Sequence, residues 1–145
     1  MANVRDPEPP ANAFTHRFEV APSDIDMLGH AGNVSWLRWV NEAATAHSVS
    51  IGLDLEAYRA LGVLWVVRRH EIDYLGQAFE GETLEALTWV ETLRGATSLR
   101  RTLFRRAADA ASLSRAATTW VLLDIASGRP RRIPRELLER YGFGG

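Results

Sequence analysis

The longest helical pattern in the chain is NVSWLRWVNEAATAHSVSIG, residues 33–52. Residues suited to an inward face recur every three or four positions, at Val34, Leu37, Val40, Ala44, His47 and Ile51. Asn33 is predicted to cap the start, because its side-chain oxygen can accept a first-turn amide, and Gly52 is predicted to end the helix. A helix of about 18 residues spans about 27 Å. The alanines at 43, 44 and 46 would let another element pack closely against it.

The segments on either side of this helix have the composition of strands. Thr15–Ala21 alternates apolar and polar residues before Pro22, which predicts a short strand. After a short helix predicted over 54–61 and ended by Gly62, four stretches rich in Val, Leu, Thr and Trp are separated by turn residues. These predicted strands are 63–75, 82–93, 97–107 and 113–125. Their short connections predict an antiparallel meander, and Pro134–Tyr141 predicts a short final helix.

The resulting layout is an α+β domain with five antiparallel strands and one long helix. Residues 1–13 hold three prolines and no periodic pattern, so a flexible N-terminal arm is predicted before a single domain at 14–145. One helix cannot cover both faces of a five-stranded sheet. We therefore expect a homo-oligomer, either a dimer or a tetramer.

Composition excludes several classes of chemistry. The 145 residues include no cysteine, so disulfides and thiolate chemistry are excluded, and all 17 basic residues are arginine, so no lysine Schiff base can form. With no signal-peptide pattern and no apolar run near 20 residues, we expect a cytoplasmic protein that does not enter a membrane. Residues 1–93 hold 6 arginines and 14 acidic residues, whereas residues 94–145 hold 11 arginines and 4 acidic residues. The basic second half is suited to phosphates or to an acidic carrier protein, or its arginines form solvated strand faces. No nucleic-acid-binding motif accompanies it.

The richest chemical segment is the turn Asp24-Ile-Asp-Met-Leu-Gly-His-Ala-Gly-Asn33, which leads directly into the long helix. A helix start offers unpaired N–H groups and a partial positive charge, which suit a developing oxyanion. A carboxylate beside it can act as a base or a nucleophile. We interpret Asp24 as a turn or capping residue. On position alone, Asp26 and His30 fit either a structural or a functional role.

Metal sites and a serine triad have no support in the sequence. Asp24 and Asp26 open a calcium-loop pattern, but its fifth and twelfth positions are Leu28 and Ser35. The histidines show no spacing typical of a zinc site, and Ser23 lacks the Gly-x-Ser-x-Gly setting of many hydrolases. We therefore expect no metal.

The pattern that begins in this turn resembles the hotdog-fold acyl thioesterases, of the 4-hydroxybenzoyl-CoA thioesterase type and the related acyl-carrier-protein thioesterases. It reads Asp24-x-Asp26-x-x-Gly29-His30-x-x-Asn33-x-x-Trp36-Leu37-x-Trp39-x-x-Glu42-Ala43. Weaker similarity continues to about residue 141. The resemblance implies a sheet wrapped around a central helix, chains paired side by side, and hydrolysis of an acyl-CoA or acyl-carrier-protein thioester. It implies no cofactor, with coenzyme A present only as part of the substrate.

The resemblance also implies roles for individual residues. Asp26 falls on the family's catalytic aspartate, which acts as general base or nucleophile, and His30 and Asn33 are the other candidate catalytic residues. The amides of Gly32, Asn33 and Val34 would hold the oxyanion. Glu42 and Trp36 are candidate supporting residues. Two positions depart from the family pattern: Leu28 replaces an asparagine of the carrier-protein enzymes, and Trp36 replaces the usual tyrosine.

Two further expectations concern ligand binding and alternatives. The arginines expected to meet CoA phosphates are Arg68, Arg69, Arg100 and Arg101. A non-catalytic acyl-CoA sensor or assembly subunit remains the alternative function, and the histidine–acid patterns of hotdog hydratases are not found. The sequence leaves open the acyl group and the choice between CoA and a carrier protein.

Overall fold

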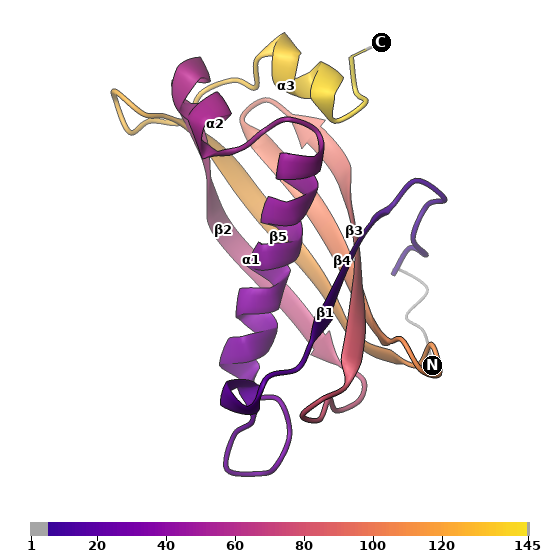
Figure 1. The fold of residues 1–145 in the computed structure, drawn as a ribbon. Coiled ribbons are helices and arrows are strands. Elements are labelled where there is room, and N and C mark those ends of the chain that lie inside the picture. The colour runs from indigo at the N-terminus through magenta and orange to yellow at the C-terminus, as the bar shows by residue number, and fades with distance from the viewer. Residues whose placement is uncertain (1–5, 145) are drawn as a thin grey trace.

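The computed structural model describes residues 6–144, and Figure 1 shows one long helix lying across a curved sheet. A single 3-10 turn, η1 (Pro22–Asp24), precedes the long helix. The other elements, in chain order, are β1 (Phe14–Glu19), α1 (Asn33–Ser50), α2 (Leu55–Leu61), β2 (Val63–Tyr74), β3 (Thr83–Arg94), β4 (Thr97–Arg106), β5 (Ser112–Asp124) and α3 (Arg135–Arg140). The predicted α+β layout, with five strands and a short final helix, is confirmed.

The five strands form one antiparallel sheet in the order β1-β3-β4-β5-β2. The predicted four-strand meander is therefore wrong in one respect, because β2 pairs with β5 and not with β3. The segment between β2 and β3 is no tight hairpin: Ala78 within it is fully buried and accepts a hydrogen bond from the amide of Ala31. This connection passes the start of α1 before β3 begins. The three-stranded meander β3-β4-β5 therefore lies between the two edge strands, β1 and β2.

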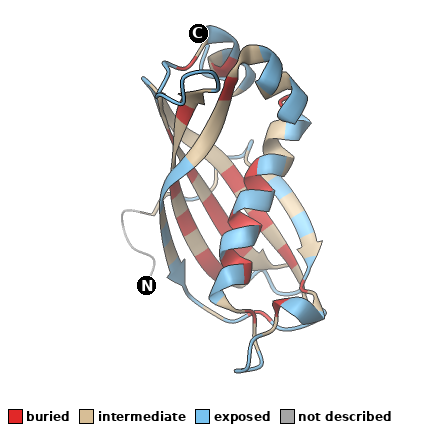
Figure 2. Ribbon diagram, turned by 90° about the vertical axis from the view of Figure 1, so that its left-hand side faces the viewer, coloured by how far each residue is buried: buried red, intermediate tan, exposed pale blue. Residues whose placement is uncertain are grey.

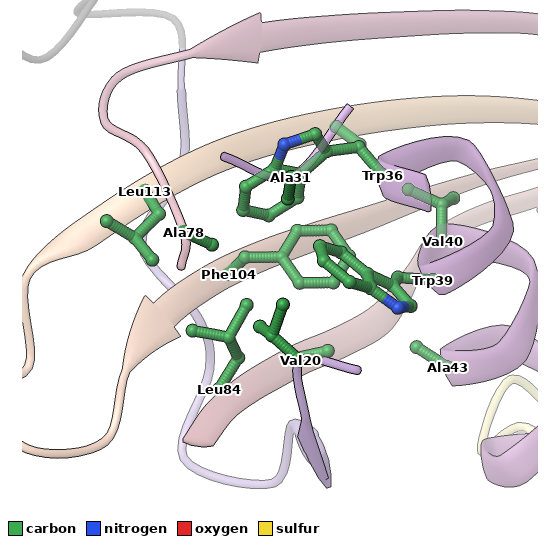
Figure 3. Packing of buried hydrophobic residues seen from close by; sticks show 12 residues of the cluster. Val20, Ala31, Trp36, Trp39, Val40, Ala43, Ala78, Leu84, Phe104 and Leu113 are labelled. Atoms are coloured by element: carbon green, nitrogen blue, oxygen red, sulfur yellow. The ribbon is translucent and has the colours of Figure 1, made fainter. Parts of the chain in front are cut away.

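Helix α1 packs against one face of the sheet, but not through the whole of the predicted stripe (Figure 2). The prediction is wrong at Val34 and Leu37, which are exposed because the tryptophan side of the helix faces the core instead. Trp36, Trp39, Val40 and Ala43 recur at helical spacing and are almost fully buried. The two tryptophan rings meet edge to face, with centroids 4.9 Å apart, and Phe104 of β4 packs against Trp36 at 5.3 Å. Figure 3 shows these rings at the centre of the core. The packing fixes the position of the helix start, and hence of the turn before it.

The start of α1 differs from the prediction by one residue. Asn33 is the first helical residue, and Gly32 occupies the cap position with an extended backbone and no side-chain hydrogen bond. The interpretation of Asn33 as the cap is therefore wrong. At the other end, Ile51 caps the helix and Gly52 follows with a positive φ of 82°, as the sequence predicted.

A second apolar cluster lies at the far end of α1, beneath the two short helices. Leu53, Val63, Leu122, Ile133 and Leu137 are all buried there. Asp54 caps α2 by accepting a hydrogen bond from the amide of Ala57. This cluster holds α2 and α3 against the sheet at that end of α1.

The described part of the predicted arm, residues 6–13, lies beside the sheet. Glu8 forms an ion pair with Arg115 of β5 at 3.1 Å. Asp6 and Pro7 line a small cavity with Trp89 and Arg101, on the sheet face away from α1. Residues 1–5 of the predicted arm lie outside the described residues.

Candidate functional site

The turn between η1 and α1 is closed by its own backbone. The amide of Asp26 donates to the carbonyl of His30 at 3.0 Å, and the amide of Gly29 donates to the carbonyl of Asp26 at 3.1 Å. Gly29 has a φ of 85°, which a side chain would strain. Asp26 and His30 are thus held at the two ends of one tight loop, immediately before the helix.

The Asp26 side chain is exposed and lies beside the start of α1. Its Oδ1 accepts a hydrogen bond from the amide of Leu28 at 2.8 Å. Its Oδ2 faces Gly32, where a Cβ atom would come within 3.4 Å of that oxygen. Because Gly32 has no side chain, the carboxylate approaches the helix backbone closely. One oxygen is therefore occupied, while Oδ2 has no hydrogen-bond donor among residues 6–144.

Of the three backbone amides at the cap and first two residues of α1, one donates a hydrogen bond and two have no acceptor among residues 6–144. The amide of Gly32 donates to the carbonyl of Asp24 at 3.1 Å, so it is not available to an oxyanion, and that part of the prediction is wrong. The amides of Asn33 and Val34 have no acceptor among the described residues. These two donors lie at the positive end of the helix dipole, beside the Asp26 carboxylate.

Asp24, two residues from Asp26, has the opposite environment. It is buried and accepts hydrogen bonds from the amide of Ala21 at 2.9 Å and the hydroxyl of Ser35 at 2.9 Å, and it pairs with Arg38. Burial raises the pKa of its carboxyl, but the hydrogen bonds from Ala21, Arg38 and Ser35 outweigh that effect and lower it. The interpretation of Asp24 as a turn residue is confirmed, since it ties η1 to α1.

Glu42 lies one helical turn beyond Arg38 and does not touch Asp26. Its carboxylate is exposed and accepts a hydrogen bond from Arg38 Nε at 3.1 Å. Glu42, Arg38 and Asp24 form a chain of charges along α1. Sequence reasoning missed Arg38: the i, i+4 spacing to Glu42 was visible, but the contact with Asp24 spans 14 residues and depends on how η1 packs.

A cavity of about 370 Å³ lies next to the turn, lined by His30, Asn33 and Trp36 together with Tyr74 and the residues that follow it. The Trp36 ring is buried and meets the Tyr74 ring with centroids 6.3 Å apart. His30 is partly exposed, with Nδ1 3.2 Å from the carbonyl oxygen of Ala31. The structure thus brings three predicted residues together around one space, at the end of the loop that holds Asp26.

The four candidate phosphate-binding arginines do not form one group. Arg68 is an exposed residue at an irregularity in β2, and Arg69 pairs with Glu71. Arg101 donates to Glu91 at 2.8 Å on the face away from α1. Arg100 points the other way, because successive strand residues alternate, and it is buried against α1. The four arginines therefore do not lie together on one face, and their contact with CoA phosphates stays a prediction.

Residues 6–144 contain neither a cluster of metal-ligating side chains nor a membrane-spanning helix. No group of three or more His, Asp or Glu side chains is placed to hold a metal ion. No helix in this part of the chain is long and apolar enough to cross a membrane.

A family model, described as the thioesterase-like superfamily, matches residues 20–141, so the chain belongs to that superfamily. No curated protein matches the chain. The match spans the turn, α1 and the whole sheet except β1.

Solved structures share the fold at low sequence identity. A 1,4-dihydroxy-2-naphthoyl-CoA thioesterase from Synechocystis superposes with a TM-score of 0.81 and 20% identity, over 89% of this chain and 95% of that one. A hypothetical protein from Staphylococcus aureus in complex with CoA gives 0.84 and 14%, over 91% and 83%. A hypothetical protein from Aquifex aeolicus gives 0.82 and 21%, over 88% and 98%. The fold of this chain is the hotdog fold.

Proposed function

We propose that this member of the thioesterase-like superfamily hydrolyses acyl thioesters, either of coenzyme A or of an acyl carrier protein. The observation that carries the proposal is the Asp26 carboxylate, whose Oδ2 is unpartnered among residues 6–144 and lies beside the unused amides of Asn33 and Val34. A base or nucleophile next to two amide donors is the equipment that acyl transfer to water requires. The adjacent cavity gives an acyl group room to bind.

The general-base route needs only groups on this chain and one water. Asp26 Oδ2 takes a proton from the water as its oxygen attacks the thioester carbonyl carbon. The carbonyl oxygen becomes an oxyanion, which the amides of Asn33 and Val34 stabilise. The carbon–sulfur bond then breaks, and the thiolate takes up the proton to leave as a thiol beside the free acid. An aspartate is ionised at neutral pH, so it is ready to accept a proton.

The alternative route begins with a direct attack by Asp26 on the carbonyl carbon. Thiolate leaves first, and a mixed anhydride with the Asp26 side chain is then hydrolysed by water. Single-turnover hydrolysis in ¹⁸O-labelled water separates the routes. Label in the Asp26 carboxylate indicates the anhydride, because direct attack by water on the thioester places label only in the product acid.

His30, Asn33 and Trp36 complete the proposed site as residues that face the same cavity. The role proposed for His30 is to orient the substrate or to pass a proton to the leaving thiolate. Trp36 is held by the core, so it serves as a fixed wall of the acyl-binding space. Glu42 is proposed to support the site indirectly, through Arg38 and Asp24.

A CoA-type substrate is favoured by two of the structural neighbours. The Synechocystis protein is a thioesterase for a naphthoyl-CoA, and the Staphylococcus aureus protein is in complex with CoA. We propose coenzyme A as a part of the substrate and no resident cofactor.

The function is tested by measuring thiol release from a panel of short, medium, long and aromatic acyl-CoAs, followed by acyl-carrier-protein substrates. Turnover with any member is the expected result, and the preferred member names the acyl group. Tight binding of acyl-CoA without turnover on the whole panel would contradict the proposal. It would support the alternative of a non-catalytic sensor or assembly subunit.

A further inference from the structure

A second cavity, of about 260 Å³, lies at the opposite end of α1 from the Asp26 turn. It is partly open to solvent and is lined by the last turns of α1, by α2, by strands β2–β5 and by the residue that caps α3. Its walls include Ser48, Tyr58, Trp65, Arg100, Trp120 and Tyr141. Asn33 and Ser48 are both on α1, and 15 residues of helix span on the order of 22 Å. The second cavity is thus separate from the turn of the same chain.

Arg100 is the unusual residue in this cavity. It is 4% exposed, and its Nη1 donates to His47 Nδ1 at 2.9 Å and to Thr88 Oγ1 at 3.0 Å. No carboxylate of the described residues pairs with it. Asp24, the other buried charged residue in this part of the chain, has its counter-ion in Arg38. The remaining arginines without a carboxylate partner within residues 6–144 are all exposed, namely Arg59, Arg68, Arg94, Arg129 and Arg132.

The groups around Arg100 supply polar atoms but no negative charge. A guanidinium can only donate, so His47 Nδ1 accepts and the imidazole is neutral. Burial, and then the Arg100 charge, lower the pKa of His47 to about 4. Burial raises the pKa of Tyr58, so its phenol is neutral as well. A buried charge without a counter-ion is costly, and an anion entering the cavity would relieve that cost.

The hydroxyl groups form a second set of donors in the same space. Ser48 Oγ and Tyr141 Oη are 2.7 Å apart, and the hydroxyls of Tyr58 and Tyr141 are 3.0 Å apart. In addition, the indole N–H of Trp120 is buried and has no acceptor within the described chain. Donors of several kinds, with the positive charge at Arg100, line a cavity whose other walls are aromatic and aliphatic.

From these observations we infer that the second cavity binds the carboxylate of a compact organic acid or acyl group, with Arg100 as its counter-ion. A guanidinium matches a carboxylate in shape and charge, and the hydroxyls of Tyr58 and Tyr141 add neutral donors. Trp65, Leu64 and Val90 provide the surface for an apolar body. An apolar cavity of about 150 Å³ accommodates benzene, so 260 Å³ accommodates a ring or short chain with a carboxylate attached.

The test measures binding without any catalysis. Benzoate, phenylacetate and hexanoate are titrated into the protein by calorimetry, each against its neutral amide. At least one acid is expected to bind ten or more times more tightly than its amide. In Arg100→Gln this preference is expected to disappear, while Arg94→Gln, an exposed arginine without a carboxylate partner in the described chain, retains it. Asp26→Asn retains it too, so this result does not depend on thioester hydrolysis.

Either of two results would overturn the inference. One is that none of the three acids binds more tightly than its amide, and the other is that folded Arg100→Gln keeps the preference for the acid. If Arg100→Gln does not fold by circular dichroism, Tyr141→Phe replaces it, since that change removes one donor and keeps the ring. An unchanged affinity for every acid in Tyr141→Phe would then overturn the assignment.

Two sources of such a carboxylate are distinguished by a kinetic arm, which rests on the proposed function. The turn of the same chain is too far from Arg100 for a six-carbon acyl group to bridge them, so an acyl group would have to be presented by the turn of a second copy of the chain. In that case, Arg100→Gln lowers kcat/KM for adipoyl-CoA at least tenfold and leaves hexanoyl-CoA unchanged. If the carboxylate belongs to a free acid, the ratio of the two substrates stays the same while acid binding is lost. Absence of turnover would count against the proposed function alone, because the binding arm still reports on the cavity.

Discussion

Asp24 and Asp26 are two residues apart and are separated in function by the direction of their side chains. Asp24 turns into the molecule, where Ser35 and Arg38 hold it, while Asp26 turns out toward solvent beside the helix start. The first carboxylate therefore contributes to stability. The second retains an oxygen that the described residues leave free for chemistry.

Replacing Asp24 with Asn should destabilise the fold by about 1–3 kcal/mol, because Arg38 and the Ala21 amide lose a charged acceptor. Glu42→Gln is the matched control, since Glu42 also pairs with Arg38 but is exposed, and it should change stability by less than about 1 kcal/mol. Urea denaturation measures both. Equal effects from the two variants would contradict the assignment of Asp24 as the structural anchor.

His47 makes stability depend on pH in mildly acidic solution. The folded-state pKa is about 4, below the ordinary 6.5, because burial and Arg100 disfavour the charged imidazole. The unfolded chain therefore binds a proton first, and the free energy of unfolding falls as the pH drops from 6.5 toward 4. Because solvent screens the half-buried ring, the fall should be only about 1–2 kcal/mol. Urea denaturation at several pH values should show this slope in wild type and lose it in His47→Gln. An identical slope in both proteins would contradict the account.

For single residues, the sequence predicted contacts only where residues close together in the chain are also close together in space. The carboxylate and imidazole of the turn could be predicted, because Asp26 and His30 lie four residues apart in one loop. The pairing of Arg38 with Asp24 and the burial of Arg100 could not, because both depend on packing between distant elements. Leu99, Arg101 and Leu103 share one strand parity, so the pattern did not reveal which face of β4 each residue occupies.

The start of α1 is the element that connects the fold to the proposed chemistry. Its first two amides are left without acceptors among residues 6–144, and Gly32 lets the Asp26 carboxylate approach. Gly32 has an ordinary extended backbone, with φ −83° and ψ 163°, so its lack of a side chain is needed for space and not for conformation.

Gly32→Ala should consequently affect activity more than stability. The added Cβ would lie 3.3 Å from the Asp26 Cβ, so the carboxylate must shift by a few tenths of an ångström. We expect kcat to fall by about 10- to 100-fold, since small displacements of reacting groups are costly. Thermal unfolding should change little. A variant with wild-type kcat would show that the close approach of Asp26 to the helix start is not used.

Most of the helices and strands could be predicted from the sequence. All five strands were predicted within two residues of their observed bounds, because turn glycines and runs of Val, Leu and Thr delimit them. The errors concern choices that local patterns do not encode. Gly32, not Asn33, caps α1. Strand β2 pairs with β5 and not with β3, because the connection after β2 runs past the start of α1 before β3 begins.

A second chain could cover two surfaces of the molecule: the sheet face away from α1, and the free edge of strand β2. Helix α1 lies on one face of the sheet (Figure 1), and residues 6–8 of the arm lie beside the opposite face. Strand β2 is 12 residues long and forms one edge of the sheet, with Val67 exposed on it. A long free edge with apolar residues is suited to pairing with another copy.

We therefore predict that the protein is a homodimer or homotetramer in solution. Sedimentation velocity at micromolar concentration should show a mass of two or four chains. A single species with the mass of one chain would contradict the prediction, and it would also mean that the Asp26 site is complete within one protomer.

The most direct test of the account is the steady-state kinetics of Asp26→Asn on the preferred acyl-CoA. Asparagine keeps the size of the side chain but cannot accept the proton or attack the thioester efficiently. We predict that kcat falls by about 100- to 10,000-fold while the affinity for acyl-CoA, measured by calorimetry, is preserved. A folded variant that retains wild-type kcat would show that the chemistry is performed elsewhere in the molecule.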